Sequence, residues 1–239
     1  MVKLPLHIIM PIKDSIDMAE RAILAIVNSG HTLCIYDDYS TEENTHRLNQ
    51  IAEKYNIQLI HLSSLTTQPS PNYRTILQHA RKTALQLHQH LVITESDVIV
   101  HQDTICRLYN EVQKGVGLVA AATTDENSIY NFPYQYLLKW RYQHLDKNTI
   151  STKKRLSFCC TLLTNELLQK TNFDLLDPKK NWFDVTISHW SLSLGLKNLL
   201  MLGNTALHFP HSSRPWKSLK YTNPWLYYWR KIIQNRDRI

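Results

Sequence analysis

Two carboxylates interrupt an apolar stretch in the first half of the chain. The stretch reads LVITESDVIV, residues 91–100, and its flanks have the β-branched, apolar character of a buried strand. Glu95 and Asp97 stand two residues apart where that strand turns, so both can offer oxygen atoms to one hard divalent cation. Such a cation usually shares its coordination with substrate phosphates. The spacing therefore favours metal-assisted binding of a phosphate or diphosphate.

A second acidic pair, Asp37 and Asp38, ends another apolar stretch, TLCIYDDYS. In an open α/β sheet, ligands bind beyond the carboxyl ends of the strands, where the strand order reverses. Either pair alone is equally well explained as a helix cap or a turn. Two pairs on the same edge of a sheet favour a binding site.

Phosphate binding here cannot depend mainly on a glycine-rich loop, because the chain has only five glycines and no GxxxxGKS/T sequence. A cation and basic side chains must take that role. Arg74, Arg81 and Lys82 are the candidates. The alternative for each is a solvent-exposed helix face, and we favour that alternative for Arg81 and Lys82.

These side chains need a frame, and strand and helix patterns alternate along the first hundred residues. Apolar runs predict strands at 4–12, 32–40, 57–64 and 90–100, and helical spacing predicts helices at 16–29, 41–55 and 72–89. That alternation is typical of a parallel sheet covered by helices on both faces. The rest of the chain predicts a helix at 104–112, a strand at 115–124, a connection over the site at 125–154, a strand and helix at 155–173, a helix within 181–197 and a strand pair at 198–209.

Composition limits the class of protein. The chain has 239 residues, 43% of them hydrophobic, which suits one domain with a sizeable core. Its net charge of +7 suggests an anionic partner, whether nucleotide, nucleic acid or lipid headgroup. The four cysteines contain no CxxC spacing, which argues against a zinc cluster and disulfides, and the adjacent Cys159 and Cys160 are expected to pack in a strand. No apolar run fits a signal peptide or a membrane span, so we expect a cytoplasmic protein.

The last residues, 216–239, form a basic and aromatic segment. Tryptophan and tyrosine mixed with lysine and arginine suit the surface of a membrane. The alternative is a helix that packs on the domain or on a second subunit through Trp225, Tyr228, Trp229 and Ile232. The sequence leaves both interpretations open, and it leaves the oligomeric state open as well.

The chain resembles the inverting glycosyltransferases of family two, which have the GT-A fold. The resemblance covers roughly residues 6–213 and rests on stretches in the family's order and spacing: IIMPIKD, IYDDYST, NYRTILQHARKTA, VITESDVIV, GLVAAATTD, FCCTLLTNELLQKTNFD and FDVTISHWSLSLGLK. It implies a Rossmann-like, mostly parallel central sheet flanked by helices, with a GT-A domain at 1–215. Residues 1–125 would form the nucleotide-sugar-binding half and 126–215 the acceptor-binding half.

The resemblance also implies a role for each candidate residue. The nucleotide-binding residues would be Pro11, Asp37, Asp38, Asn72, Arg74 and Ser96. The metal, Mn2+ or Mg2+, would be bound by a variant DXD motif made of Glu95 and Asp97 and by a histidine, His208 or alternatively His211. Asp184 would be the catalytic base. This chain departs from the family pattern in three places: its DXD motif begins with Glu, its later acidic motif, WFDVT, keeps one acid, and the glycines often found around the segment of Asn72 are missing.

In function, the resemblance implies transfer of a sugar, with inversion, from a nucleoside diphosphate sugar to a hydroxyl of a glycan or lipid-linked acceptor in surface polysaccharide or lipopolysaccharide synthesis. Uridine diphosphate is the favoured carrier because the family uses it most often. A tail that binds lipid would hold the enzyme at the inner face of the cell membrane. One alternative is a catalytically inactive GT-A-like interaction protein. Another is a basic nucleic-acid-binding protein, but the chain has no RNP motif, zinc-finger spacing or helix-turn-helix pattern, so we expect no nucleic acid partner.

Overall fold

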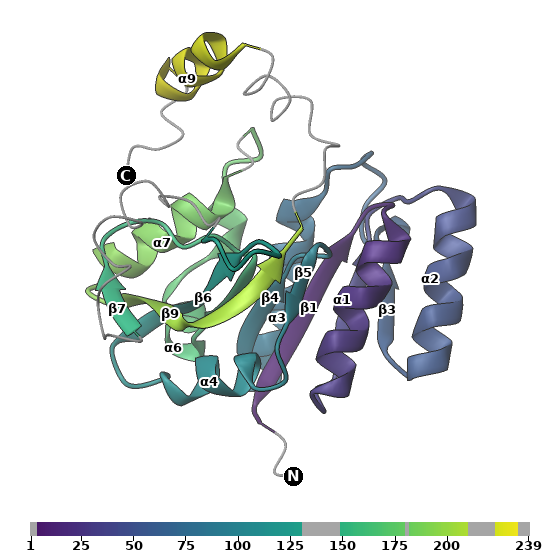
Figure 1. Ribbon diagram of the computed structural model, residues 1–239, viewed down its shortest axis with the longest axis horizontal. Helices are drawn as coiled ribbons and strands as arrows, with labels where there is room; N and C mark the ends of the chain where they lie inside the picture. The colour runs from purple at the N-terminus through teal and green to yellow at the C-terminus, as the bar shows by residue number, and fades with distance from the viewer. Residues whose placement is uncertain (1–3, 131–148, 180–181, 210–222, 234–239) are drawn as a thin grey trace.

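The computed structural model describes residues 4–130, 149–179, 182–209 and 223–233 (Figure 1). In chain order the elements are β1 (Leu6–Ile12), α1 (Ile16–Asn28), β2 (Cys34–Asp37), α2 (Glu42–Tyr55), β3 (Gln58–His61), α3 (Tyr73–Gln86), β4 (His90–Thr94), β5 (Val98–Val100), α4 (Thr104–Asn110), β6 (Val116–Thr124), β7 (Thr149–Thr152), β8 (Cys160–Leu163), α6 (Asn165–Lys170), α7 (Phe183–Ser193), β9 (Lys197–His208) and α9 (Pro224–Ile233). Two short 3-10 helices, Leu62–Ser64 and Phe173–Leu175, follow β3 and α6.

The strands of these described ranges form one sheet in the order β3-β2-β1-β4-β8-β6-β9-β5, and β7 also pairs with β9. β3, β2, β1 and β4 are parallel neighbours, and β6 is parallel to β9. β8, β5 and β7 run antiparallel to their partners. The chain places β2 and then β3 on one side of β1, and β4 on the other side. The strand order therefore reverses at β1, and sheets of this class bind ligands next to such a reversal. The predicted α/β sheet flanked by helices is confirmed.

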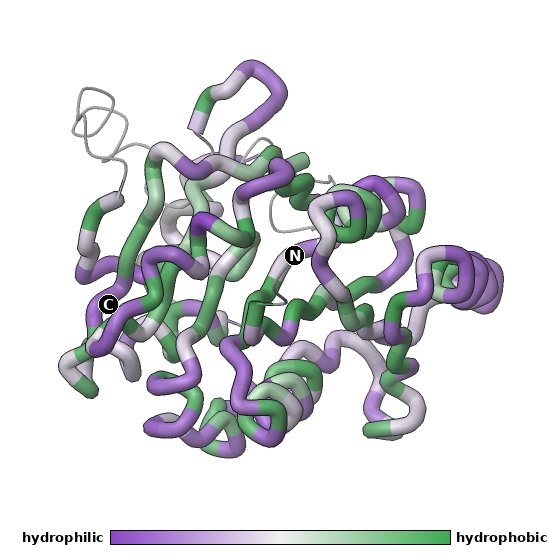
Figure 2. The backbone as a smooth tube through the Cα atoms, turned by 90° about the horizontal axis from the view of Figure 1, so that it is seen from below, coloured by the Kyte–Doolittle hydropathy of each residue, from purple (hydrophilic) through white to green (hydrophobic). Residues whose placement is uncertain are grey.

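Helices cover both faces of the sheet, and each face has its own apolar core. Helices α1, α2 and α4 cover one face, with Ile23 and Leu48 among the buried side chains. Helices α3, α6 and α7 cover the other face, with Ile76 and Ile187 in its core. Figure 2 shows that the strands are mostly hydrophobic and that the outermost helix, α2, is mostly hydrophilic, as expected for a layered domain.

Three expectations about individual strands are wrong. Residues 90–100 form two strands, β4 and β5, rather than one. The expected strand pair at 198–209 is one long strand, β9, which ends at His208. Ala121 pairs with Met201 and Ala122 with Thr205, so the residues between Met201 and Thr205 form a bulge rather than a turn. Part of the expected connection at 125–154 is a strand, β7, beside β9, and residues 131–148 lie outside the described ranges.

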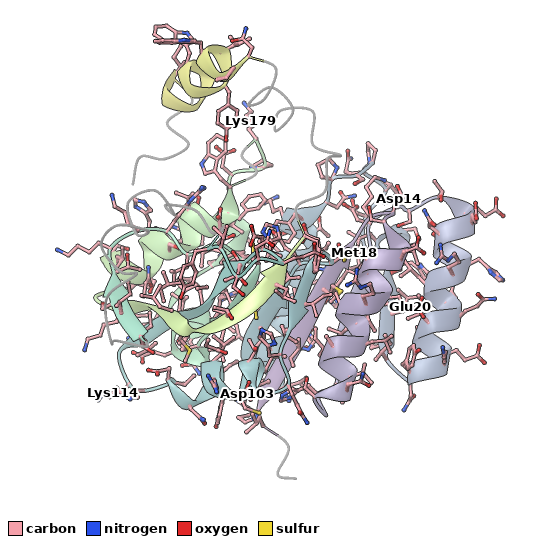
Figure 3. All side chains as sticks on the ribbon, in the orientation of Figure 1. Asp14, Met18, Glu20, Asp103, Lys114 and Lys179 are labelled. Carbon is pink, nitrogen blue, oxygen red and sulfur yellow. The ribbon has the colours of Figure 1, made fainter. Side chains whose placement is uncertain are left out.

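The parallel strands all end at one edge of the sheet. Asp14, which follows β1, lies at this edge, whereas Asp103 and Lys114 lie at the opposite edge (Figure 3). The Asp14 carboxylate accepts hydrogen bonds from the Thr41 backbone N–H at 3.0 Å and from the Asn44 side-chain amide at 2.9 Å. These bonds fasten the start of α2 to the end of β1, so the loops at this edge are braced against each other.

Helix α9 lies apart from the sheet in Figure 1. It has a row of exposed apolar side chains. Trp225, Trp229 and Ile233 are 88%, 62% and 61% exposed, and they follow one another at four-residue steps along one face. The two tryptophans therefore do not pack on the domain, while the side chains of Tyr228 and Ile232 lie outside the described part. Among the described helices, none has the length and apolar character needed to cross a membrane.

A buried histidine lies near the start of β1. Burial, and then the nearby charge of His79 in α3, lowers the pKa of His7 from its ordinary 6.5 to about 4. The folded protein thus keeps His7 neutral at pH values where the unfolded chain protonates it. Between these two pKa values the unfolded state binds more protons than the folded state. The free energy of unfolding is therefore unaffected by His7 above pH ~6.5 and falls as the pH drops toward the pKa of the folded state.

We predict that His7→Leu makes the protein less sensitive to acid. When the pH falls from 7 to ~4, the free energy of unfolding of the wild-type protein drops by about 3 kcal/mol on account of His7, because only the unfolded chain protonates it. Leucine does not titrate, so the variant lacks this drop. Urea unfolding of both proteins at the two pH values measures the difference. Because the charge of His79 acts on His7, the difference between the two proteins measures His7 together with its coupling to His79. An equal loss of stability in the two proteins would contradict the prediction.

Candidate active site

The centre of the candidate site is a three-residue turn between two strands that have different partners. β4 pairs antiparallel with β8, and the Glu95 N–H donates to the Cys159 carbonyl at 3.0 Å just beyond the last paired residues. β5 pairs antiparallel with β9, and the Phe209 N–H donates to the Asp97 carbonyl at 2.9 Å. The turn at 95–97 therefore lies between the start of β8 and the end of β9. Because three residues span only about 10 Å, the sheet must curl to bring β9 close to β4.

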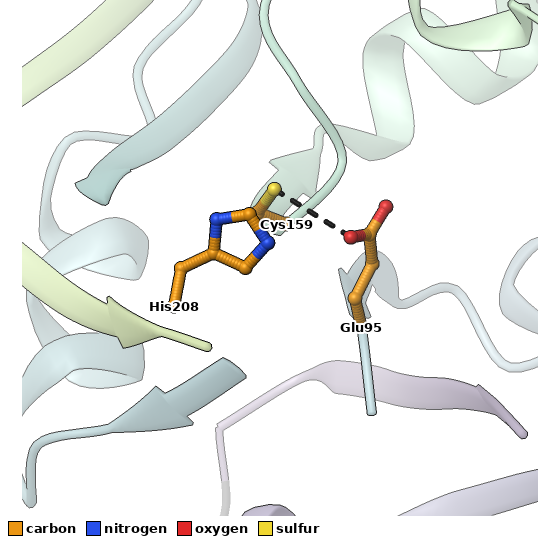
Figure 4. A group of neighbouring side chains, drawn as sticks. All are labelled: Glu95, Cys159 and His208. Carbon is orange, nitrogen blue, oxygen red and sulfur yellow. Dashed lines mark hydrogen bonds between the residues drawn. The ribbon is translucent and has the colours of Figure 1, made fainter. Parts of the chain in front are cut away.

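Four side chains converge at this turn. The ligand atoms of Glu95, Cys159 and His208 all lie within 4.8 Å of one another. Figure 4 shows the His208 ring, the Cys159 thiol and the Glu95 carboxylate turned toward one another. The Cys159 thiol donates to Glu95 Oε2 at 3.7 Å, and His208 Nε2 is 3.3 Å from Asp97 Oδ2. The fold thus brings together the three predicted metal ligands Glu95, Asp97 and His208, whereas His211 lies outside the described residues.

The donor set fits a divalent cation. Carboxylate oxygens suit Mg2+ and Mn2+, and an imidazole nitrogen suits transition metals. The Asp97 side chain is only 4% exposed, and a carboxylate buried to this degree needs a nearby positive charge or hydrogen-bond donors. A cation bound at this turn would supply that charge.

Cys159 is a member of the cluster that sequence reasoning missed. The sequence analysis assigned both adjacent cysteines to strand packing. Both cysteines belong to the buried core, as expected, but the Cys159 thiol also contacts Glu95 just beyond the last pair of the ladder between β4 and β8. Burial, followed by the negative charge of Glu95, raises the pKa of the Cys159 thiol well above its ordinary value. The sequence contains no sign of this contact, because antiparallel pairing between segments so far apart leaves no periodic pattern.

The end of β2 holds a second group of predicted residues. Asp38 is buried, and its carboxylate accepts hydrogen bonds from the Ser70 hydroxyl at 2.9 Å, the Asn72 N–H at 2.9 Å and the Asn72 side-chain amide at 2.8 Å. The Asp38 N–H in turn donates to the Ile12 carbonyl, which ties it to the end of β1. Two predicted nucleotide-binding residues, Asp38 and Asn72, are therefore in direct contact at the switch point of the sheet.

Asp37 faces a different set of partners. Its carboxylate accepts from the Ser40 N–H at 3.0 Å and the Thr45 hydroxyl at 3.0 Å, and lies 3.1 Å from His61 Nδ1. Burial alone would raise the pKa of Asp37, but the hydrogen bonds from Ser40, His61 and Thr45 outweigh burial and lower it. Asp37 therefore stays charged and fixes the turn that carries Asp38.

The basic candidates occupy distinct positions on α3. The Arg74 guanidinium donates to the Asp174 carbonyl at 2.7 Å, and Arg81 Nε donates to the Leu168 carbonyl at 3.0 Å. Lys82 is exposed, as the solvent-facing interpretation predicts. Both arginines thus bind α3 to the α6 region. Lys13 is a further cation at the carboxyl edge of the sheet, and its ammonium donates to the Tyr39 carbonyl at 2.8 Å.

The two remaining candidates for nucleotide binding are Pro11 and Ser96. Pro11 is half-buried near the end of β1, paired with Tyr36, two residues before Lys13. Ser96 is half-buried in the turn between Glu95 and Asp97. Both therefore belong to the carboxyl edge of the sheet.

Asp184 lies in the first turn of α7, where the positive end of the helix dipole favours a carboxylate. Its Oδ2 is 3.9 Å from Nη1 of Arg155, and the two side chains are 20% and 18% exposed. Asp184 also adds to the negative charge that acts on the Cys159 thiol, so it lies within electrostatic range of the cluster at the turn. Arg155 comes from the loop before β8 and is a second neighbour that the sequence analysis did not identify.

Comparison with known families finds a match over most of the chain. The model of the family described as Glycosyl transferase family 2 matches residues 7–171. A comparison with curated proteins finds no match.

Solved structures resemble this chain in fold at low sequence identity. GalNAc-T7 with UDP, GalNAc and Mn2+ superposes with a TM-score of 0.66 at 10% identity, over 89% of this chain and 45% of that one. Glucosyl-3-phosphoglycerate synthase from Mycobacterium tuberculosis, in complex with Mn2+ and UDP-glucose, gives 0.54 at 14% identity, over 90% and 74%. A mycobacterial protein gives 0.56 at 14% identity, over 88% and 69%. These similarities confirm the fold expected from the sequence.

Proposed function

The chain belongs to glycosyl transferase family 2 and has the GT-A fold, and we propose that it transfers a sugar, with inversion, from a nucleoside diphosphate sugar to an acceptor hydroxyl. The observation that carries this proposal is the convergence of Glu95, Asp97 and His208 at the turn between β4 and β5. The proposed cation ligands and the Asp38–Asn72 pair both lie at the carboxyl edge of the sheet, where sheets of this class bind ligands.

In this proposal Glu95, Asp97 and His208 hold a divalent cation, either Mn2+ or Mg2+. When bound, that cation offsets the negative charge that develops on the departing diphosphate. Lys13 lies at the same edge and adds a positive charge. Uridine diphosphate is the proposed carrier, in keeping with the complexes of GalNAc-T7 with UDP and of the mycobacterial synthase with UDP-glucose.

Asp38 and Asn72 are proposed to bind the nucleobase of the donor. An ionised carboxylate offers about four lone-pair positions, and the donors from Ser70 and Asn72 use three of those on Asp38. The remaining position can accept the imide N–H of uracil. Asp37 has the supporting role of holding the turn, and Pro11, Arg74 and Ser96 are the further residues proposed to line the nucleotide.

Asp184 is the proposed catalytic base. A carboxylate that removes the proton of the attacking hydroxyl contributes about 10²–10⁴-fold to the rate. Arg155, whose Nη1 is 3.9 Å from Asp184 Oδ2, places a positive charge beside this carboxylate. Attack in line with the departing diphosphate inverts the anomeric carbon.

The proposed acceptor is a glycan or a lipid-linked glycan of surface polysaccharide or lipopolysaccharide synthesis. The exposed row Trp225, Trp229 and Ile233 on α9 supports contact with a membrane surface, because tryptophan and apolar side chains of such a helix enter the headgroup region. The net charge of +7 favours anionic lipid. This contact would hold the cytoplasmic enzyme at the inner face of the membrane.

We predict that Asp97→Asn and Asp184→Asn separate binding from chemistry. Asp97→Asn weakens Mn2+-dependent UDP binding at least about tenfold, since it removes a cation ligand. Asp184→Asn leaves UDP binding within about twofold of wild type and lowers the release of UDP from the active UDP-sugar by about 10²–10⁴-fold. Calorimetry measures the binding, and a panel of UDP-sugars with and without acceptors measures the release.

The matched control for this pair is Asp103→Asn. Asp103 is an exposed carboxylate at the opposite edge of the sheet, paired with Arg107, and its loss should change neither measurement. A folded wild-type protein that binds no nucleoside diphosphate with Mn2+ or Mg2+, and releases none from any nucleotide sugar, would exclude the proposed function.

We predict that replacing Trp225 and Trp229 together by Ala weakens binding to vesicles rich in phosphatidylglycerol by about tenfold or more, because two large apolar side chains no longer enter the interface. Co-sedimentation measures the binding, with phosphatidylcholine vesicles as the neutral reference. Leu175→Ala, which removes a 74% exposed apolar side chain elsewhere, serves as the matched control. If wild type and the double variant bind anionic vesicles equally, the tail is not the membrane contact.

A further inference from the structure

We propose that Cys159 is a ligand of the metal centre, and that its thiolate makes this centre bind thiophilic divalent ions such as Zn2+ and Co2+ in preference to Mg2+. The inference rests on the proposed function for the location of the centre. It goes further by adding a sulfur donor that neither a DXD motif nor the histidine supplies.

The spacing of the donor atoms supports one shared ion. Ligands bind zinc at about 2.0–2.3 Å, so two ligand atoms of a tetrahedral site are roughly 3.5 Å apart. The Cys159 sulfur and Glu95 Oε2 are 3.7 Å apart, and the nearest ligand atoms of Glu95, Cys159 and His208 all fall within 4.8 Å of one another (Figure 4). Small side-chain rotations therefore suffice to close the three donors around one ion.

The backbone fixes the thiol in this position. The Glu95 N–H donates to the Cys159 carbonyl, so the two residues are neighbours across an antiparallel ladder. Cys159 is 6% exposed, and its sulfur also contacts the Ser157 hydroxyl at 3.1 Å. A buried side chain with these contacts cannot swing into solvent. Its sulfur therefore stays beside the carboxylate that is proposed to bind the cation.

The chemistry of the donors determines which ions they favour. A cysteine, a histidine and a glutamate together match the ligand types of zinc sites, whereas Mg2+ requires oxygen ligands in octahedral geometry. On binding, a metal–sulfur bond forms, the S–H bond breaks and the proton passes to water. Most protein sites bind Zn2+ more tightly than Mn2+ in any case, so the diagnostic property is dependence on the Cys159 sulfur.

The test is a titration of the purified full chain with Co2+ alone. Thiolate coordination gives a sulfur-to-cobalt charge-transfer band in the near ultraviolet, which oxygen and nitrogen ligands do not give. We expect this band in wild type and its loss in Cys159→Ser. Competition of Zn2+ against Co2+ should show at least about tenfold weaker Zn2+ binding in the variant.

Two control variants isolate the sulfur concerned. Cys160→Ala removes the adjacent, fully buried thiol, and Cys106→Ala removes a thiol that lies 3.6 Å from His31 Nε2 and could bind cobalt on its own. Both should keep the band. Loss of the band in Cys106→Ala and its survival in Cys159→Ser would overturn the proposal.

The outcome for Cys159 is separable from the outcome for the function. A wild-type protein that binds UDP with Mg2+ but gives no sulfur band with Co2+ overturns the cysteine ligand and leaves the transferase proposal intact. A protein that binds no nucleotide with any cation overturns the function itself. If Cys159→Ser fails to fold, X-ray absorption of the zinc complex of Cys106→Ala decides instead, since a cysteine ligand places sulfur at about 2.3 Å from the metal.

Discussion

The exchange of strand partners across one three-residue turn determines where the functional groups of this protein lie. β4 runs beside β8, and β5 runs beside β9, yet only residues 95–97 connect β4 to β5. Such a short connection forces the sheet to curl until the ends of β8 and β9 flank the turn. The curl brings Glu95, Cys159 and His208 together, although they are far apart in the sequence. Each is held by backbone hydrogen bonds, so their positions are set before any ligand arrives.

Buried negative charge at this turn explains why the arrangement favours a cation and a phosphate. Asp97 is almost fully buried with His208 as its neighbour, and burying a carboxylate is costly unless opposite charge or donors compensate. The Asp38 carboxylate meets the same requirement differently, by accepting three internal hydrogen bonds. Asp38 thus has three internal hydrogen-bond donors, and Asp97 lies beside His208 in a cluster whose ligand types suit a metal ion. That difference matches their proposed roles at the base and at the diphosphate.

Much of the frame could be predicted from sequence, because alternating strand and helix patterns and acids at strand ends are local signals. They located Glu95, Asp97 and Asp38 without knowledge of the sheet order, whereas Asn72 was named from the family resemblance alone. The pairing partners could not be read in the same way. The antiparallel ladder that brings Cys159 to Glu95 joins segments 64 positions apart, and Arg155 meets Asp184 from a loop with no pattern of its own. The bulge in β9 similarly replaced an expected turn because pairing with β6 continues past Gly203.

The most direct test of this account is a crystal of the protein grown with UDP and Mn2+, measured for anomalous scattering by manganese. The account predicts one strong peak about 2.1 Å from an Asp97 oxygen, bridging to the diphosphate, with the uracil against Asp38. A manganese peak away from the turn at residues 95–97, or a UDP molecule bound elsewhere on the protein, would contradict it.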